Sequence, residues 1–221
     1  YKDIFGVDSF VSMNIPDNLK TDSGKVNDNE KITLVYAGNL FYGRYKTLNL
    51  LAKAIREYNS LNNPRKVVLK IYTVFEPSKK EIRFLNIRNA SEYCGHLDRD
   101  ELKRVLNDCD IPVHVESFQN ASIESTRFSI STKISDYLSL SKPILAIGPS
   151  QISSMRYLDD CAFCITDPSN VFERFSKFVN DVGLRIELAK KANIKFEINH
   201  DKGKILSDIK AKILSVLCED E

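Results

Sequence analysis

Short apolar runs alternate with amphipathic stretches along most of this chain. Runs rich in β-forming residues predict strands at residues 32–37, 67–74, 91–94, 111–115, 144–147 and 161–166. Apolar positions at helical spacing predict helices at residues 46–61, 79–87, 98–106 and 151–157, with a short helix after Ser131 and two or three more between 169 and 217. The chain is therefore expected to contain both kinds of element in regular succession.

Strand and helix alternate about six times, a pattern typical of a parallel sheet covered by helices on both faces. We therefore expect an α/β fold with a doubly wound, Rossmann-like parallel sheet. Ligands of such sheets bind beyond the carboxyl ends of the strands, near the point where the strand order reverses. The polar segments 38–45, 95–98 and 116–131 each follow a predicted strand, so they are expected to converge on one rim.

The stretch 129–149, SISTKISDYLSLSKPILAIGP, carries the strongest candidate chemistry. Ser131 and Thr132 are predicted to cap a helix whose first N–H groups and the charge of Lys133 favour a phosphate. Asp136 lies three residues after Lys133, on the same side of the helix, where a carboxylate can accept hydrogen bonds from a ribose. The alternative interpretation is a capped surface helix with a solvated Lys/Asp pair.

The segment after the first strand offers further candidates for a phosphate site. Gly38 allows the backbone to approach a ligand, and Arg44 or Lys46 can reach a diphosphate. The sequence GNLFYG lacks the spacing of the dinucleotide-binding fingerprint, and an ordinary turn at Gly38 remains an alternative.

Two further loops complete the predicted rim. Backbone groups of Gly95, His96 and Leu97 can meet a base edge, although His96 is equally typical of an exposed loop. Glu116 ends a strand beside the polar segment 116–131, where it can accept a sugar hydroxyl or face water. A polar segment of this length is typical of functional loops.

Composition narrows the class of protein. The 32 basic and 30 acidic residues leave a net charge of +2, which gives no footprint for nucleic acid. We expect a cytoplasmic protein, because no apolar run reaches the ~18 residues of a membrane span. The basic excess at residues 185–212 leaves contact with a membrane surface open, although interleaved acidic residues favour a solvated face.

The cysteines and histidines do not indicate a disulfide framework or a metal site. The five cysteines stand at positions 94, 109, 161, 164 and 218. The pair Cys161 and Cys164 has CxxC spacing but lies in an apolar, strand-like run, which favours structural thiols over a redox motif. His96, His114 and His200 show no zinc-ligand spacing, so no metal and no resident cofactor are predicted.

Four motifs together resemble one protein family. They are YAGNL…YGR at 36–44, GHLDRDEL at 95–102, DIPVHVESF at 110–118 and STKISDYLSLSKPILA at 131–146. In this order and spacing they resemble the C-terminal domain of GT-B glycosyltransferases, particularly the bacterial family 4-like enzymes that build surface polysaccharides. The resemblance covers about residues 10–180 and implies a domain that binds the nucleotide-sugar donor.

The resemblance also implies roles for single residues. Gly38 matches the family's first glycine, and Arg44 or Lys46 with Lys133 would hold the diphosphate, with Ser131 and Thr132 beside them. The loop 95–97 would meet the base.

The acidic motif and the first loop depart from the family pattern. Glu116 matches the first acid of the family's paired-glutamate motif, and Asp136 matches the second, which contacts the ribose. The two acids stand twenty residues apart instead of eight, and Asn39 replaces the family's arginine.

The resemblance implies a metal-independent sugar transfer from a nucleoside diphosphate to a glycan or lipid-linked acceptor. Residues 1–31 are interpreted as a segment and linker from a missing upstream acceptor-binding domain, residues 32–180 as the donor-binding domain, and residues 181–221 as helices packing on it. This chain alone is then expected to bind donor without turnover. A noncatalytic α/β interaction module and a nucleotide-sugar epimerase-like enzyme are the alternatives.

Overall fold

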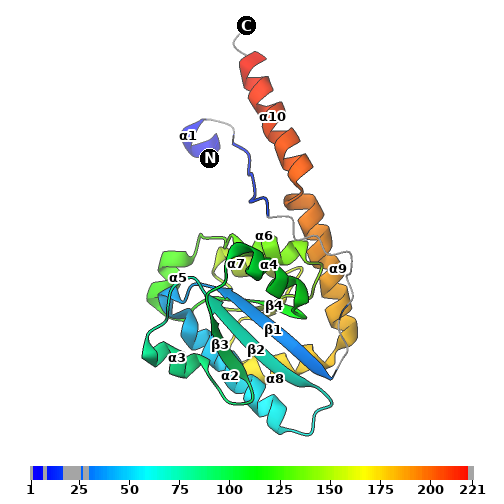
Figure 1. Cartoon of the computed structure of the whole chain (residues 1–221). Coiled ribbons are helices and arrows are strands. Elements are labelled where there is room, and N and C mark those ends of the chain that lie inside the picture. Colours follow the sequence, from blue (N-terminus) through cyan, green and yellow to red (C-terminus); the bar gives the residue numbers. More distant parts are fainter. Residues whose placement is uncertain (1, 7–8, 17–25, 27–29, 219–221) are drawn as a thin grey trace.

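Six parallel strands form the centre of the computed structural model, in the order β3-β2-β1-β4-β5-β6 (Figure 1). The structure describes residues 2–6, 9–16, 26 and 30–218. The strands are β1 (Lys31–Gly38), β2 (Lys66–Thr73), β3 (Ser91–Gly95), β4 (Ile111–Val115), β5 (Leu145–Ile147) and β6 (Phe163–Ile165). The predicted doubly wound α/β fold is confirmed, and the strand order reverses between β1 and β4.

Helices lie between successive strands and also before the first strand and after the last one. They are α1 (Lys2–Phe5), α2 (Arg44–Ser60), α3 (Lys79–Leu85), α4 (Arg99–Asp108), α5 (Asn120–Thr126), α6 (Lys133–Ser139), α7 (Ser153–Leu158), α8 (Val171–Asn180), α9 (Val182–Asn199) and α10 (Lys202–Cys218). Short 3₁₀ turns, η1 (Phe41–Gly43) and η2 (Pro168–Asn170), precede α2 and α8. Capping boxes begin α3 at Ser78 and α4 at Asp98, because each side chain accepts a hydrogen bond from the N–H three residues on.

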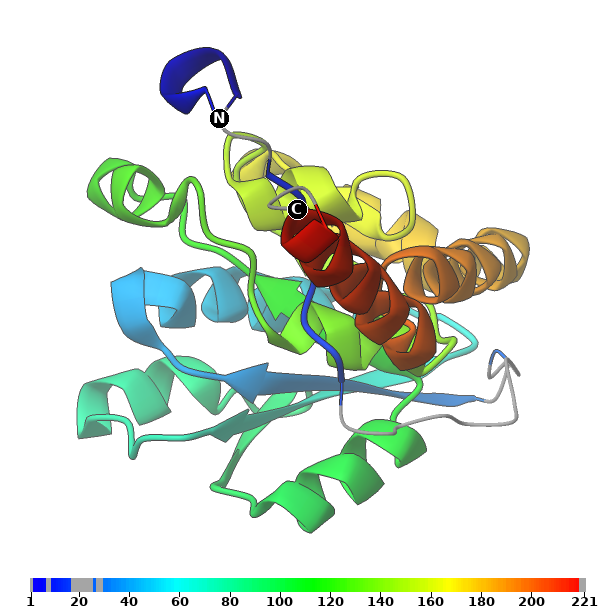
Figure 2. The ribbon, with the colours of Figure 1, turned by 90° about the horizontal axis from the view of Figure 1, so that it is seen from above.

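Helices lie on both sides of the sheet (Figure 2), and its two faces bury separate cores. Along β1, Leu34 and Tyr36 point into one core, whereas Val35 points into the other, because successive side chains of a strand alternate. Helices α2 and α8 cover the first face, where Leu51 and Phe175 are fully buried. Helices α4, α6, α7 and α9 contribute apolar side chains to the second core.

Residues 116–131 contain a short helix, α5, where the sequence predicted only a polar loop. The N–H groups of Ser122 and Ile123 both donate to the carbonyl of Gln119 and so begin the helix. Ile123 packs against the second core. The segment has no repeated apolar positions, so the periodicity that reveals the other helices is absent here.

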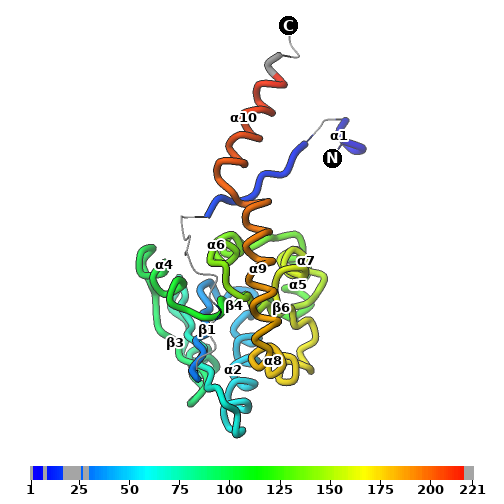
Figure 3. The backbone as a smooth tube through the Cα atoms, turned by 90° about the vertical axis from the view of Figure 1, so that its right-hand side faces the viewer, coloured from blue at the N-terminus to red at the C-terminus, as the bar shows by residue number. Residues whose placement is uncertain are grey.

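The last helices extend beyond the sheet. Helix α9 packs against α6 and α8. Helix α10 projects away from the sheet, and residues 9–13 approach its base (Figures 1 and 3). His200, between α9 and α10, is buried, and its Nδ1 lies 2.8 Å from the carbonyl oxygen of Asn14. Of residues 1–31, interpreted above as an inter-domain segment and linker, the structure describes only residues 2–6, 9–16, 26, 30 and 31.

Candidate functional site

A cavity of about 350 Å³ lies where the strand order reverses. Its walls come from the end of β1, the end of β4 and the segment that leads into α6. The predicted site residues among its lining are Gly38, Asn39, Arg44, Glu116, Ser131, Thr132 and Lys133. The carboxyl ends of β1 and β4 meet here because both strands run in the same direction, which is the position that ligands take in doubly wound sheets.

Arg44 and Glu116 form the main ion pair of the cavity. Nε and Nη2 of Arg44 donate to the same oxygen, Oε2 of Glu116, at 3.1 and 2.9 Å. The side chain of Glu116 is 3% exposed, and that of Arg44 is 15% exposed. This pair joins the first turn of α2 to the end of β4, two segments separated by 72 residues.

The backbone around Glu116 fixes this carboxylate in place. The carbonyl of Glu116 accepts a hydrogen bond from the hydroxyl of Thr47 at 2.8 Å, and its N–H donates to the carbonyl of Ile147. Gly148 lies against it, and a Cβ at that position would come within 2.7 Å of the Glu116 Cβ. The glycine is therefore required by the close approach of the two segments.

His114 contacts the second carboxylate oxygen and is a site residue that sequence reasoning missed. Its Nε2 lies 3.3 Å from Oε1 of Glu116, off the line of a good hydrogen bond. The signal was available, because His114 and Glu116 are two residues apart on a strand and so share a face. Burial alone would raise the pKa of Glu116, but His114 and Arg44 outweigh it, and that pKa lies below its usual value.

Asn39 holds the loop between β1 and α2. Its side-chain oxygen accepts hydrogen bonds from Nη1 of Arg44 at 2.8 Å and from the N–H of Phe41 at 3.1 Å. Its carbonyl accepts from the hydroxyl of Tyr36 at 2.5 Å. Burial raises the pKa of Tyr36, so the phenol stays protonated and keeps donating.

Gly38 has a structural role that the sequence did not reveal. A Cβ at Gly38 would come within 2.8 Å of the Tyr36 hydroxyl oxygen. Glycine is therefore required there by the buried phenol, in addition to the predicted approach of a ligand.

Lys133 lines the cavity, and its Nζ lies 3.4 Å from Oδ2 of Asp136. The pair is thus formed as the spacing on the helix predicts. The predicted cap is wrong, because Thr132, the N-cap of α6, makes no side-chain capping hydrogen bond and has helical dihedral angles. The backbone N–H of Ser131 instead donates to the hydroxyl of Ser154 at 3.1 Å, and the carbonyl of Ser131 accepts from the N–H of Ile134.

Several predicted residues lie outside this cavity. Lys46 is exposed on α2, because two residues correspond to about 200° of rotation from Arg44 around a helix. Gly95 has a φ of 88°, and Nδ1 of His96 lies 3.2 Å from the carbonyl oxygen of Thr73. Leu97 packs against the second core. The loop 95–97 therefore follows a neighbouring strand of the same rim but does not line the cavity.

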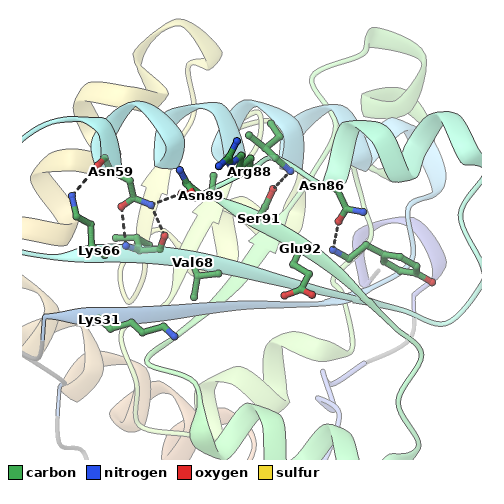
Figure 4. Close-up of a pocket in the computed structure, with 13 residues that line it drawn as sticks. Lys31, Asn59, Lys66, Val68, Asn86, Arg88, Asn89, Ser91 and Glu92 are labelled. Atoms are coloured by element: carbon green, nitrogen blue, oxygen red, sulfur yellow. Dashed lines mark hydrogen bonds between the residues drawn. The ribbon is translucent and has the colours of Figure 1, made fainter.

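A larger hollow, of about 820 Å³, lies at the amino ends of β1, β2 and β3 (Figure 4). Several of its polar side chains bind the protein's own backbone. Nδ2 of Asn59 donates to the carbonyls of Val67 and Asn89, and Oδ1 of Asn59 accepts from the N–H of Val67. The hydroxyl of Ser91 donates to the carbonyl of Leu85. These groups join β2, β3 and α2, so the hollow is built as a structural junction.

The cysteines provide no reactive thiolate pair. Cys161 is buried and Cys164 is half-buried, and both are free. Burial raises the pKa of each thiol to about 12, so neither is a thiolate near neutral pH. Within the described part of the chain, no group of three or more His, Cys, Asp or Glu side chains has a metal-binding arrangement. None of the described helices is both long and apolar enough to cross a membrane.

The fold is shared with solved structures at low sequence identity. No protein-family model matches this chain, and no curated protein sequence matches it. WaaG, a glycosyltransferase involved in lipopolysaccharide biosynthesis, is similar to 89% of this chain at 13% identity and a TM-score of 0.58, over 55% of its own length.

Two further structures match in the same way. HepE from Anabaena, in complex with UDP and glucose, matches 84% of this chain at 12% identity and a TM-score of 0.59, over 48% of its own length. A UDP-forming trehalose-phosphate synthase from Burkholderia xenovorans matches 82% at 8% identity and a TM-score of 0.56, over 43% of its length. This chain thus has the Rossmann-like fold found in about half the length of these proteins.

Proposed function

We propose that this chain is the donor-binding half of a glycosyltransferase that moves a sugar from a nucleoside diphosphate to a glycan or lipid-linked acceptor. The observation that supports it best is the cavity at the strand-order reversal, lined by the two cations Arg44 and Lys133. The same fold occurs in WaaG, a glycosyltransferase, and in HepE, which was solved with UDP-glucose.

In this proposal the two cations hold the diphosphate. Arg44 offers planar N–H groups, and Lys133 offers a charge on a side chain that is 35% exposed and free to adjust. Both would stabilise the negative charge that develops on the diphosphate as the sugar leaves. Asp136 would accept hydrogen bonds from the ribose, and the backbone of residues 95–97 would meet the base. Any catalytic base of an inverting enzyme would come from outside this chain.

The proposed reaction needs no bound metal. Two protein cations at the cavity can supply the positive charge that a metal provides in other transferases. The chain alone is then expected to bind donor and not to turn over. We keep this as a prediction, tested below with a chelator.

A second partner of this chain would be an acceptor-binding domain. Apolar side chains are exposed along α10 and in the segment that approaches its base. They are Phe10, Val11, Leu206, Ile213, Leu214 and Val216. The proteins named above are about twice as long as the part that matches this chain, so a further domain is the occupant that we propose for this surface. Contact of the basic residues in 185–212 with a membrane stays a prediction.

Isothermal titration with UDP, GDP and pyrophosphate tests the proposal. We expect at least one nucleoside diphosphate to bind. It should also raise the melting temperature, because a ligand that binds only the folded state, at 100 times its dissociation constant, adds about 2.7 kcal/mol to the unfolding free energy. The affinity is expected to survive EDTA. Absence of binding at millimolar concentration would refute the donor site, and a tenfold loss with EDTA would refute metal independence.

Two variants separate the proposed diphosphate and ribose contacts. Lys133→Ala is expected to weaken both UDP and pyrophosphate, because a charge-assisted contact contributes about 1.5–3 kcal/mol. Asp136→Ala is expected to weaken UDP and to leave pyrophosphate unchanged or tighter, because the ribose is absent and a negative charge has gone. Equal losses for both ligands in the Asp136 variant would contradict the ribose assignment.

A further inference from the structure

The carboxylate of Glu116 has a protein contact on each oxygen. Oε2 accepts two hydrogen bonds from Arg44, and Oε1 faces Nε2 of His114 at 3.3 Å. Only 3% of the side chain is exposed. Arg44 therefore occupies both acceptor positions of Oε2, and it is the main partner of this carboxylate, although Glu116 lies on the wall of the cavity.

The same contacts determine which donors of Arg44 remain for a ligand. A guanidinium carries five N–H groups in a fixed plane. Three of them, on Nε, Nη2 and Nη1, donate to Glu116 and Asn39. One N–H on each terminal nitrogen remains beyond these bonds, and Arg44 lines the cavity. N–H groups on the two terminal nitrogens of a guanidinium can bind two oxygens of one phosphate.

We infer that Glu116 is a positioning residue, which holds the guanidinium of Arg44 so that its two remaining N–H groups meet the donor diphosphate. Asn39 is the second support, on the other terminal nitrogen of the same guanidinium. This inference rests on the proposed function and replaces the sugar contact that the sequence suggested for Glu116. In this inference Glu116 acts through Arg44 and does not contact the substrate itself.

When the Glu116 carboxylate is neutralised, electrostatic repulsion and positioning predict opposite changes in phosphate affinity. A carboxylate beside a phosphate site repels the phosphate, so charge alone predicts that Glu116→Gln tightens binding. Positioning predicts weaker binding, because the amide holds the guanidinium less firmly and the planar fork loses its orientation. The two effects can therefore be told apart by measuring a single ligand.

Pyrophosphate is the probe, because it has neither ribose, base nor sugar. For the full chain we expect Glu116→Gln to weaken pyrophosphate and UDP by a similar factor, roughly tenfold. Glu124→Gln, which neutralises an exposed carboxylate on α5, is the matched control and is expected to change neither. Tighter pyrophosphate in the Glu116 variant would overturn the inference, and so would a loss confined to UDP-glucose, which would indicate a sugar contact.

A double-mutant cycle distinguishes positioning from a general loss of structure. In an Arg44→Ala background, Glu116→Gln is expected to cause no further loss of pyrophosphate affinity and, by removing a negative charge, to tighten binding slightly, because the group it positions has gone. An equal loss in both backgrounds would overturn the inference. Melting curves of each variant show the folded fraction. If the Glu116 variant does not fold, Asn39→Ala tests the same guanidinium, and we expect it to weaken pyrophosphate binding roughly threefold.

The result for the unmodified chain separates this inference from the proposed function. If the unmodified chain binds neither UDP nor pyrophosphate, the proposed donor site fails and this inference falls with it. If the unmodified chain binds both and both Glu116→Gln and Asn39→Ala bind equally well, only the positioning role is overturned.

Discussion

The two ends of the central sheet carry hollows of opposite character. The hollow at the amino ends is larger, at about 820 Å³, and its side chains Asn59 and Ser91 bind backbone groups of the protein (Figure 4). The cavity at the carboxyl ends is smaller, at about 350 Å³, and it gathers the cations Arg44 and Lys133. Volume alone would select the amino end, whereas the proposed function places the ligand at the carboxyl end. Asn59 and Ser91 bond backbone groups of neighbouring elements in the larger hollow, whereas Arg44 and Lys133 both line the smaller cavity, where the strand order reverses.

This difference follows from the parallel topology. All six strands run in parallel and end at the same edge of the sheet, where the connecting segments at residues 39–43 and 116–132 lie close together around the cavity. At the opposite end, the segments that lead into β2 and β3 lie close together. Asn59 joins them by donating hydrogen bonds to the carbonyls of Val67 and Asn89. Changes at the carboxyl end should alter ligand binding, whereas changes at the amino end should alter stability alone.

The largest effect is expected at the carboxyl end, for Arg44→Ala. The substitution leaves the carboxylate of Glu116 buried without its cation, which typically costs about 3–5 kcal/mol of unfolding free energy. Urea unfolding measures the change. Adding Glu116→Gln to Arg44→Ala removes the unpaired negative charge and should recover part of the lost unfolding free energy. A cost below about 1 kcal/mol for Arg44→Ala would mean that water already solvates this carboxylate.

At the amino end, Asn59→Ala is expected to lower the unfolding free energy by about 1–3 kcal/mol, because groups of Val67 and Asn89 lose their partners. UDP affinity should not change. The matched control is Asn62→Ala, at an exposed position, with an expected effect within about 0.5 kcal/mol. Weaker UDP binding by folded Asn59→Ala would remove the proposed division between the two ends.

The pH dependence of stability should come from the carboxyl end. The folded-state pKa of Glu116 lies below its usual value, so its contribution to stability is complete above the unfolded pKa and is lost as the pH falls through the folded one. We therefore expect the stability difference between the unmodified chain and Glu116→Gln to be constant from pH 7 to about 5 and to narrow below about pH 4.5. Urea unfolding across this range checks it. A difference that grows with acid would give the opposite sign and contradict the assignment.

The sheet was predictable from the sequence because its strands are short apolar runs bounded by turn residues. The reversal between β1 and β4 placed the candidate loops on one rim by topology alone. Helix α5 was not predictable, because it is held by the carbonyl of Gln119 and by one partly buried side chain, Ile123, without a periodic apolar face. Periodicity reveals elements that pack along their whole length and misses those fixed at one point.

The site was only partly predictable, for a different physical reason. Sequence reasoning selected Arg44 and Glu116 as separate ligand contacts, but it could not pair them across 72 residues. That pairing depends on the register of β1 against β4, which aligns Leu34 with Ile111. The wrong cap at Thr132 has a local cause, because helical dihedral angles at that residue prevent the side chain from bonding back to the first turn.

The smallest expected effect tests the comparison most directly. The double variant Lys31→Ala and Arg88→Ala removes two exposed cations from the amino-end hollow. Seven steps along β1 separate Lys31 from Gly38, roughly 23 Å at about 3.3 Å per residue, which exceeds two screening lengths at physiological salt. The pyrophosphate affinity of the double variant should therefore stay within about twofold of that of the unmodified chain. Lys133→Ala removes only one cation but should weaken pyrophosphate binding more. Titration of both variants at physiological salt decides the matter. A larger loss in the double variant than in Lys133→Ala would place the anion site at the amino end, in the larger hollow, and would reverse the comparison between the two ends of the sheet.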